Sequence, residues 1–295
     1  MKKPAILTFY CDWDRCPDNM LGSCFAEFRD NGAENLVFSS VWMSRVLREP
    51  SFFGFLKNVA RGKIGFMEMH SVYGESYDLA SMVTARREGL IRDHIRSMQY
   101  AADLGCRTYT VHVGAYDSVV DHVPNEVLRP LAVESLEKLL PTAEKLGMII
   151  AVENAFERSN TPEEVMYYVD HFRHPNIRCC FDCGHANIMD TFPGKGAYGH
   201  YMTDTVWSGR IEHCSDAFER MAPAMVTCHL HDNDGYSDQH MPPGMGCVDW
   251  ELLAKKLRND APELLTIQTE SGIFSKGVSI RDTVERFRRI FPELL

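Results

Sequence analysis

MIIAVENAFERSNTPEEVMYYVDHFRHPNIRCCFD (residues 148–182) contains one complete strand–helix–strand unit. Residues 148–153 and 177–182 are short apolar runs with the length of buried strands. Between them, a threonine precedes a proline and two glutamates, which is typical of the start of a helix. We therefore expect a helix over residues 162–172, and two strands joined through a helix are expected to pair in parallel.

The same alternation recurs along the whole chain. The other six expected strands cover residues 5–9, 36–40, 64–69, 108–113, 225–229 and 265–270. The clearest other helices cover residues 85–104, 130–146, 250–257 and 280–291. No Pro/Gly/Ser-rich linker divides the 295 residues, and a closed barrel of eight strand–helix units typically takes about 250 residues. We therefore predict a single α/β domain over residues 1–295, a (β/α)8 TIM barrel, in preference to an open doubly wound sheet.

The composition is that of a globular protein and argues against two classes of partner. Hydrophobic residues make up 45% of the chain and charged residues 24%, and no apolar run approaches the about 18 residues that a membrane span needs. A formal net charge of −10 disfavours a protein whose affinity depends on the phosphates of nucleic acid. We expect neither a membrane nor a nucleic acid as partner.

Three features of the sequence bear on localisation and assembly. The apolar segment at residues 5–10 is too short for a secretory signal, so we expect a cytoplasmic protein. Without a secretory context, the ten cysteines are most simply free thiols. The long segment at residues 192–223, with Trp207 as an exposed aromatic, could form the contact of a homo-oligomer.

Acidic and histidine side chains stand at the carboxyl ends of the expected strands. In a (β/α)8 barrel these ends meet at one face, where the active site forms. Glutamate, aspartate and histidine together suit a divalent ion such as Mn²⁺, Mg²⁺, Co²⁺ or Zn²⁺, so we predict a metal site there. The residues at these ends are Glu68, His70, His112, Glu153, Asp182, His185, His229, His231 and Glu270.

The three glutamates are not equivalent. Glu153 and Glu270 are charged residues at the ends of apolar strands, where a carboxylate is rarely buried without a partner. We expect both to bind metal or to take part in catalysis. Glu68 is expected to be an ion-pair partner instead.

The histidines and Asp182 each have a structural alternative. Asp182 and His185 could be a turn aspartate and a helix-start histidine. His70 and His112 could be core histidines. His231 could contact a metal ligand and orient it rather than bind the metal itself. Histidines without a converging partner are expected at the surface; they are His94, His122, His171, His174, His200 and His213.

A loop rich in metal-binding residue types, HLHDNDGYSDQHMPPGMG (residues 229–246), follows the seventh expected strand. His229 and His231 point to the same face because side chains alternate along a strand. Asp238 and His240 can fold back toward the same point. The alternative is an acidic, solvated loop that follows one buried histidine.

Five short features give the chain a family resemblance. They are VENA (residues 152–155), FDCGHAN (181–187), HLHD (229–232), PPGMG (242–246) and the strand-end Glu270. In this order they resemble the xylose isomerase-like TIM-barrel superfamily. That superfamily includes sugar isomerases, ketose 3-epimerases, inosose dehydratases and type IV apurinic endonucleases.

The resemblance implies a metal site and a reaction. The residues that correspond to the four ligands of one divalent ion, with Mn²⁺ as the leading candidate, are Glu153, Asp182, His229 and Glu270. Glu153 and Glu270 would remove and return a proton next to a sugar carbonyl, through a metal-stabilised enediolate. His185, His231 and His240 would orient substrate hydroxyls. We therefore predict a metal-dependent ketose isomerase or 3-epimerase with a small sugar or polyol as substrate.

Other outcomes stay open. The same first step followed by loss of a β-substituent would give a sugar or cyclitol dehydratase or lyase, and a barrel could also bind a sugar without converting it. The endonuclease branch is a three-zinc phosphodiesterase, and the counterparts of its additional ligands are His70, His112, His185, Asp238 and His240. FDCGHAN and PPGMG look more like the sugar branch, and no cluster of arginine and lysine suggests a grip on DNA.

Three positions depart from the pattern of the sugar enzymes. His231 stands where many relatives have lysine, and Met245 stands where glutamate is usual. His240 falls where ketose epimerases place a substrate-binding arginine, so a phosphorylated substrate is not suggested.

Overall fold

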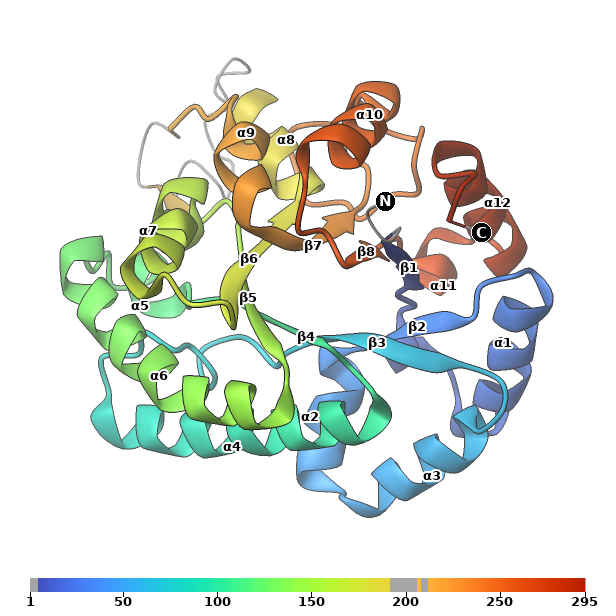
Figure 1. Ribbon diagram of the computed structural model, residues 1–295, viewed down its shortest axis with the longest axis horizontal. Coiled ribbons are helices and arrows are strands. Elements are labelled where there is room, and N and C mark those ends of the chain that lie inside the picture. Colours follow the sequence, from blue (N-terminus) through green and yellow to red (C-terminus); the bar gives the residue numbers. More distant parts are fainter. Residues whose placement is uncertain (1–4, 192–205, 208–211, 295) are drawn as a thin grey trace.

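The computed structural model describes residues 5–191, 206–207 and 212–294. Eight parallel strands form a closed barrel, in which each strand pairs with its neighbour in sequence and β1 pairs with β8 (Figure 1). The strands are β1 (Ile6–Phe9), β2 (Asn35–Phe38), β3 (Gly65–His70), β4 (Thr108–Val111), β5 (Ile149–Glu153), β6 (Ile177–Asp182), β7 (Met225–Leu230) and β8 (Thr266–Thr269). The predicted (β/α)8 fold is confirmed.

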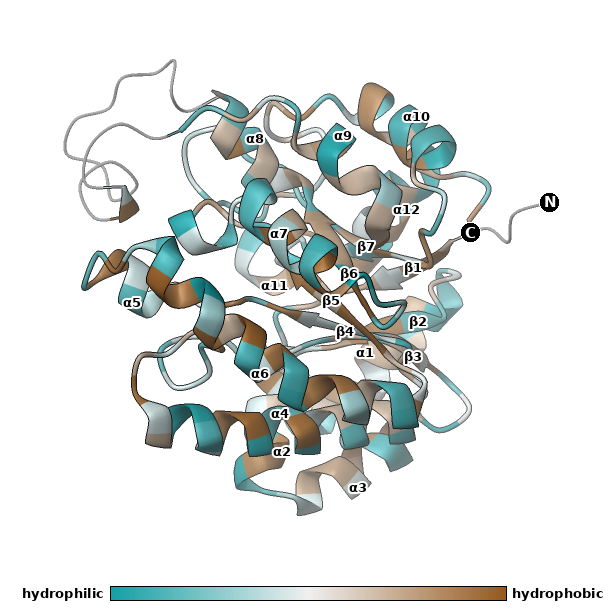
Figure 2. Cartoon of the chain, turned by 60° about the vertical axis from the view of Figure 1, so that its left-hand side comes forward, coloured by the Kyte–Doolittle hydropathy of each residue, from teal (hydrophilic) through white to brown (hydrophobic). Residues whose placement is uncertain are grey.

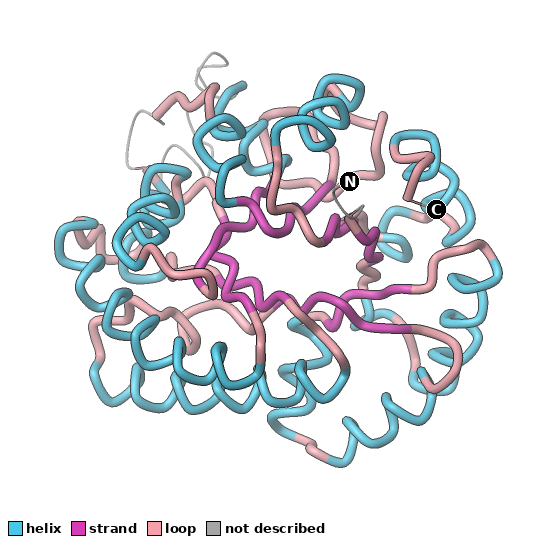
Figure 3. Tube along the Cα trace, in the orientation of Figure 1, coloured by secondary structure: helices cyan, strands magenta, loops and turns pink. Residues whose placement is uncertain are grey.

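Helices surround the barrel on its outside, as Figure 3 shows. The longer ones are α1 (Asp18–Asp30), α2 (Ser40–Arg48), α3 (Ser51–Ala60), α4 (Thr84–Leu104), α6 (Asn125–Leu146), α7 (Pro162–Phe172), α8 (Cys183–Thr191), α10 (Trp250–Asp260) and α12 (Ile280–Ile290). Three short helices lie in the loops, namely α5 (Tyr116–Val119), α9 (Ala217–Met221) and α11 (Ile273–Lys276). Hydrophilic and hydrophobic residues alternate along α4 and α6 (Figure 2), as expected for helices that pack one face on a sheet.

The element boundaries follow local signals in the sequence. Each strand begins and ends within two residues of its predicted position. Thr161 accepts a hydrogen bond from the backbone N–H of Glu164 (3.4 Å) and so caps α7 as expected. Gly105 and Gly147 end α4 and α6 in the left-handed conformation, with φ of 99° and 64°. The largest difference is at α6, where Pro130 lies in the second turn rather than at the helix start.

The barrel interior is polar below its carboxyl end. Thr110 on β4 and Thr227 on β7 are fully buried, and both hydroxyls donate to Oε1 of Glu68 on β3 (3.3 and 2.8 Å). The apolar core lies instead between the outer faces of the strands and the surrounding helices. Polar side chains therefore extend from the middle of the barrel toward the expected site.

The histidines expected at the surface divide into three groups. His94 on α4 is fully buried, which corrects the prediction, because its ring fits between the hydroxyl of Tyr109 (2.8 Å from Nδ1) and the backbone carbonyl of Tyr77 (3.2 Å from Nε2). The exposed or half-buried ones are His122, His171, His174 and His213. His200 lies outside the described residues.

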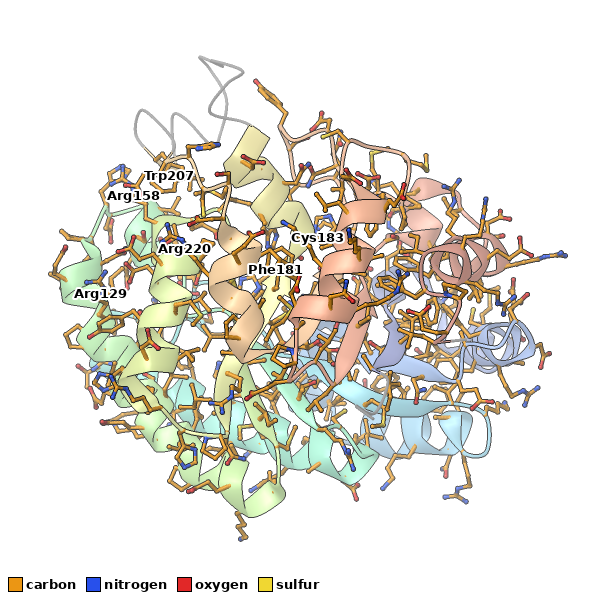
Figure 4. All side chains as sticks on the ribbon, turned by 45° about the horizontal axis from the view of Figure 1, so that its top comes forward. Arg129, Arg158, Phe181, Cys183, Trp207 and Arg220 are labelled. Carbon is orange, nitrogen blue, oxygen red and sulfur yellow. The ribbon has the colours of Figure 1, made fainter. Side chains whose placement is uncertain are left out.

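Trp207 is also buried rather than exposed, with 3% of its surface accessible. Its indole N–H donates to the carbonyl of Phe156 (2.8 Å), and the guanidinium of Arg158 lies over its ring, 5.4 Å from the centroid. Figure 4 shows Arg158 and Trp207 side by side. Trp207 is therefore not available for an oligomer contact, and residues 192–205 and 208–211 of the expected contact segment lie outside the described residues.

Two simpler expectations can be compared directly with the structure. Among residues 5–191, 206–207 and 212–294, no helix has both the length and the apolar character needed to cross a bilayer. All ten cysteines are free thiols, as expected. Cys16 and Cys24 have their sulfur atoms 3.6 Å apart.

Candidate metal centre

The carboxyl ends of the strands open into a cavity of about 530 Å³, within the size range of small-molecule sites. The predicted site residues that line it are His70, His112, Glu153, His185, Asp238, His240 and Glu270. Asp182, His229 and His231 are fully buried beside them. All ten predicted site residues therefore gather at one face of the barrel.

Four buried residues form a central group of metal-binding atoms. Glu153, Asp182, His229 and Glu270 each offer one ligand atom, and these four atoms all lie within 4.8 Å of one another. They come from β5, β6, β7 and the residue after β8. Nδ1 of His229 lies 3.0 Å from Oε1 of Glu153 and 3.1 Å from Oε1 of Glu270.

Several buried polar atoms in this group and beside it lack hydrogen-bond partners among the described residues. Oε2 of Glu153 lies 3.0 Å from Nε2 of His112 and 3.3 Å from Nε2 of His70. In the part of the chain that the structure describes, Oε2 of Glu153, Nε2 of His112 and Oδ2 of Asp182 have no hydrogen-bond partner. A bound divalent ion would satisfy buried polar atoms that converge in this way and lack a hydrogen-bond partner. The residues present therefore fit a metal.

Two of the central carboxylates, Glu153 and Asp182, are held in their ionised form. Burial would raise the pKa of Glu153, but the charges of His229 and His112 outweigh it and hold the pKa well below its usual range. Burial opposes the same effect at Asp182, where His185 and His231 lower the pKa. Ionised oxygens are the form that binds metal.

A second group of ligand-type atoms lies next to the first. His185, His231, Asp238 and His240 also each offer one atom, all within 4.8 Å of one another. Oδ2 of Asp238 lies 3.1 Å from Nε2 of His240 and 3.5 Å from Nε2 of His185. The rings of His231 and His240 stack with centroids 4.0 Å apart. The loop after β7 thus folds back over the site.

Two histidines of this second group, His240 and His185, have raised pKa values because carboxylates lie beside them. Burial would lower the pKa of His240, but the carboxylate of Asp238 raises it to about 9. Burial likewise opposes the rise in the pKa of His185, which Asp182 and Asp238 produce. His240 also has a φ of 48°, which is uncommon for a residue with a side chain and costly unless the surroundings enforce it.

Backbone carbonyls fix the ring orientation of three histidines. Nδ1–H of His70 donates to the carbonyl of Ser71 (2.9 Å), that of His185 to the carbonyl of Asn154 (2.9 Å), and that of His240 to the carbonyl of Glu270 (3.0 Å). In each ring Nε2 is left facing a carboxylate of the site. Such a bond selects the tautomer in which Nε2 can bind a metal.

The loop itself is held by Asp232. Its carboxylate accepts the backbone N–H of Gly244 (2.8 Å) and of Val248 (3.1 Å) and the indole N–H of Trp250 (2.9 Å). This explains the aspartate in HLHD. Met245, at the position where the resemblance leads one to expect glutamate, is 45% exposed and is not among the residues that line the cavity.

The sequence prediction missed an aromatic part of the cavity wall. Tyr73 stacks on His112 with ring centroids 5.5 Å apart, and Phe156 meets His185 edge to face at 5.3 Å. Both side chains line the cavity. Each lies three residues after the end of a strand, and this position could have identified both as cavity residues. The prediction selected acidic and histidine residues only, so it did not include them.

Comparison with known proteins agrees with this architecture. A family model described as xylose isomerase-like TIM barrel matches residues 55–290. An uncharacterized protein of Methanocaldococcus jannaschii is 24% identical over 70% of this chain and 61% of its own length. An uncharacterized protein of Sinorhizobium fredii is 26% identical over 53% of this chain and 45% of its own length. This chain thus matches less than two thirds of the length of either relative.

Solved structures resemble the whole described fold. A D-tagatose 3-epimerase-like protein superposes with a TM-score of 0.70 at 16% identity, covering 99% of this chain and 98% of that one. D-psicose 3-epimerase in the presence of D-fructose gives 0.68 at 17% identity, covering 98% and 97%. The IolI protein with a bound zinc atom gives 0.70 at 12% identity, covering 99% and 98%. At sequence identities this low, the structural similarity is evidence for a shared fold alone.

Proposed function

We propose that this chain, which belongs to the xylose isomerase-like TIM-barrel family, is a divalent-metal-dependent isomerase or 3-epimerase of a sugar. The observation that carries the proposal is the placement of two buried carboxylates, Glu153 and Glu270, within 3.0 and 3.1 Å of the same nitrogen of His229. Both also line the cavity, where a substrate would lie. Structural neighbours described as sugar 3-epimerases support the same class of reaction.

The chemistry needs a proton to leave one carbon and return to it or to its neighbour. A divalent ion held by Glu153, Asp182, His229 and Glu270 would make that proton more acidic by polarising the adjacent carbonyl. Glu153 and Glu270 are then the residues that accept and return the proton. Return to the same carbon from the other side gives an epimer, and return to the neighbouring carbon gives an isomer.

The second group of side chains would position the substrate. His185 and His240 present Nε2 to the cavity beside the carboxylate of Asp238. Since each Nδ1–H is already engaged with a backbone carbonyl, Nε2 would accept from a sugar hydroxyl when the ring is neutral and donate to one when the ring is protonated. Tyr73 and Phe156 supply apolar ring surface on which a sugar could stack.

The charge of the cavity favours an uncharged substrate. In the described part of the chain, no arginine or lysine lines the cavity. Four carboxylates outside both ligand groups add to its negative charge, namely Asp12, Glu75, Asp78 and Glu157. Phosphate groups are usually bound by arginine or lysine, so a free sugar or polyol fits better than a sugar phosphate or DNA.

A three-zinc phosphodiesterase is the second candidate. It is favoured by the second group of ligand atoms and by a third, in which His70 joins Glu153 and His229. If all three groups held zinc, the ions themselves would supply the positive charge that the cavity wall lacks. The preference for a sugar enzyme therefore depends on how many ions bind.

Metal stoichiometry and two activity assays test the choice. Metal content of the purified protein is measured by mass spectrometry, and deuterium incorporation from solvent is followed by NMR in a panel of ketoses. One ion per chain and deuterium at a single sugar carbon are expected. Three zinc ions per chain together with cleavage of DNA at abasic sites would overturn the proposal in favour of the second candidate.

A further inference from the structure

Glu68 is a buried carboxylate that none of the roles above uses. It lies on β3 with no accessible surface, inside the barrel and below the cavity. Burying a charged group is costly unless nearby donors compensate for the lost water. A neutral side chain would fill the same space at lower cost, so the charge calls for a specific reason.

The contacts of Glu68 cross the barrel to β7. Its Oε1 accepts the hydroxyl of Thr227 (2.8 Å) and lies 3.2 Å from Nε2 of His229. Strands β3 and β7 are not neighbours in the sheet. Thr227 and His229 are two residues apart on one strand, so both side chains point into the barrel and meet the same oxygen.

His229 differs from His70, His185 and His240 in the partner of its second nitrogen. His70, His185 and His240 each donate Nδ1–H to a backbone carbonyl and present Nε2 to the site. His229 is turned the other way: Nδ1 faces Glu153 and Glu270, and Nε2 faces the carboxylate of Glu68. The partner of His229 is therefore a full negative charge rather than a carbonyl dipole.

We propose that Glu68 is a positioning residue that accepts Nε2–H of His229 and thereby commits Nδ1 to the metal. The bond fixes the tautomer and the ring orientation, and the negative charge makes the imidazole a stronger ligand. Glu68 itself touches neither substrate nor metal. The inference rests on the metal site of the proposed function, but not on which sugar, or which reaction, the site serves.

Metal affinity in a matched pair of variants tests the role. Zn²⁺ and, separately, Mn²⁺ are titrated calorimetrically into the metal-free full-length protein. Glu68→Gln keeps the size of the side chain and removes the charge, and we expect affinity to fall about 10- to 100-fold. The control, Glu164→Gln, removes the charge of another buried carboxylate, which pairs with Arg129 (2.6 Å) on the outside of the barrel, and should bind as the wild type does.

A spectroscopic signature separates this role from a general effect on stability. In ¹⁵N-histidine-labelled protein with Zn²⁺ bound, His229 should show a proton on Nε2 at low field, as expected for a bond to a carboxylate. That resonance should move upfield in Glu68→Gln and stay in place in Glu164→Gln. The wild-type spectrum alone is informative if Glu68→Gln does not fold, because a proton on Nδ1 of His229 would overturn the inference.

The possible failures are distinguishable. Unchanged affinity in a folded Glu68→Gln protein would overturn the role of Glu68 and leave the proposed function intact. A wild-type protein that binds neither Zn²⁺ nor Mn²⁺ would overturn both. Loss of sugar turnover is not used as a readout, so an incorrect choice of substrate cannot imitate either result.

Discussion

At the scale of single residues, Glu270 combines two properties that the proposed reaction needs. It belongs to the central ligand group, and it is 6% exposed on the cavity wall, so it can meet both an ion and a substrate. The side-chain amide of Gln268 donates to its Oε1, which holds that oxygen toward His229. Its second oxygen, 3.6 Å from Nδ1 of His240, is free to exchange a proton.

Glu270→Gln should therefore lose proton exchange. The amide cannot carry the proton, so deuterium incorporation into a ketose substrate, measured by NMR, is expected to fall at least about 100-fold. Glu263→Gln changes an exposed carboxylate that pairs with Arg178 (2.8 Å) away from the site, and it serves as the control. Metal content is measured in both variants, and rapid exchange in a metal-loaded Glu270→Gln protein would contradict the assignment.

Asp238→Asn tests the second group of side chains. Asparagine keeps the shape but weakens the interactions with His185 and His240, so we expect kcat/KM to fall by roughly 30-fold, equivalent to about 2 kcal/mol. The single ion at the central group should remain, as measured by metal content. If the wild type instead held more than one ion and this variant lost one, Asp238 would be a metal ligand and the phosphodiesterase candidate would gain support.

At the scale of secondary-structure elements, α4 is attached to β4 through a buried histidine. Nε2–H of His94 donates to the carbonyl of Tyr77, and Nδ1 accepts the hydroxyl of Tyr109, so the neutral ring satisfies both groups. Burial lowers the pKa of His94 from 6.5 to about 4. In the unfolded chain the same ring protonates near its ordinary pKa.

This difference predicts a loss of stability in mild acid. Between pH 6.5 and about 4 the unfolded chain binds a proton at His94 that the folded chain does not, so the free energy of unfolding decreases as pH falls. From pH 7 to 4.5 the wild type should lose about 2 to 3 kcal/mol more than His94→Gln, measured by urea denaturation. His171→Gln, at an exposed histidine of α7, is the matched control. Equal losses in wild type and His94→Gln would contradict the prediction.

At the scale of the whole molecule, closure of the barrel creates the site. The pairing of β1 with β8 brings Glu270 round to the same face as Glu153, and the loop after β7 completes the wall. This arrangement brings five carboxylates close together, and their mutual repulsion destabilises the fold. They are Glu68, Glu153, Asp182, Asp238 and Glu270. Burial lowers the pKa of His185 and His240, but the carboxylates beside them outweigh it and raise both pKa values, so positive charge on these rings offsets part of the repulsion.

A bound metal should therefore stabilise the whole fold. At a free metal concentration about 100-fold above Kd, binding contributes about 2.7 kcal/mol, which corresponds to a rise in Tm of roughly 4 °C for a chain of 295 residues. Tm is measured by differential scanning fluorimetry after chelation and after addition of Mn²⁺ or Zn²⁺. Asp182→Asn removes one ligand of the central group and should respond much less. Equal shifts in both proteins would mean that the metal binds elsewhere.

Much of the candidate site was predictable because the candidate ligands lie at or next to the carboxyl ends of strands. Glu153, Asp182 and His229 end or nearly end apolar runs, and a parallel barrel must bring such positions together. The buried positions of His94 and Trp207 were not predictable in this way. Both depend on partners contributed by other elements, such as Tyr109 and Phe156, and no local pattern identifies such partners.

The sequence by itself determined the order of strands and helices, the barrel class and the acidic and histidine residues at the carboxyl ends of the strands, since these depend on periodicity and on chemistry at strand ends. Only the tertiary structure decided that Asp238 and His240 form a group with His185, and that Glu68 reaches His229 across 161 positions of sequence. The physical reason is that periodicity is a property of neighbours along the chain. Contact across the barrel depends on closure and register, which all eight strands set together.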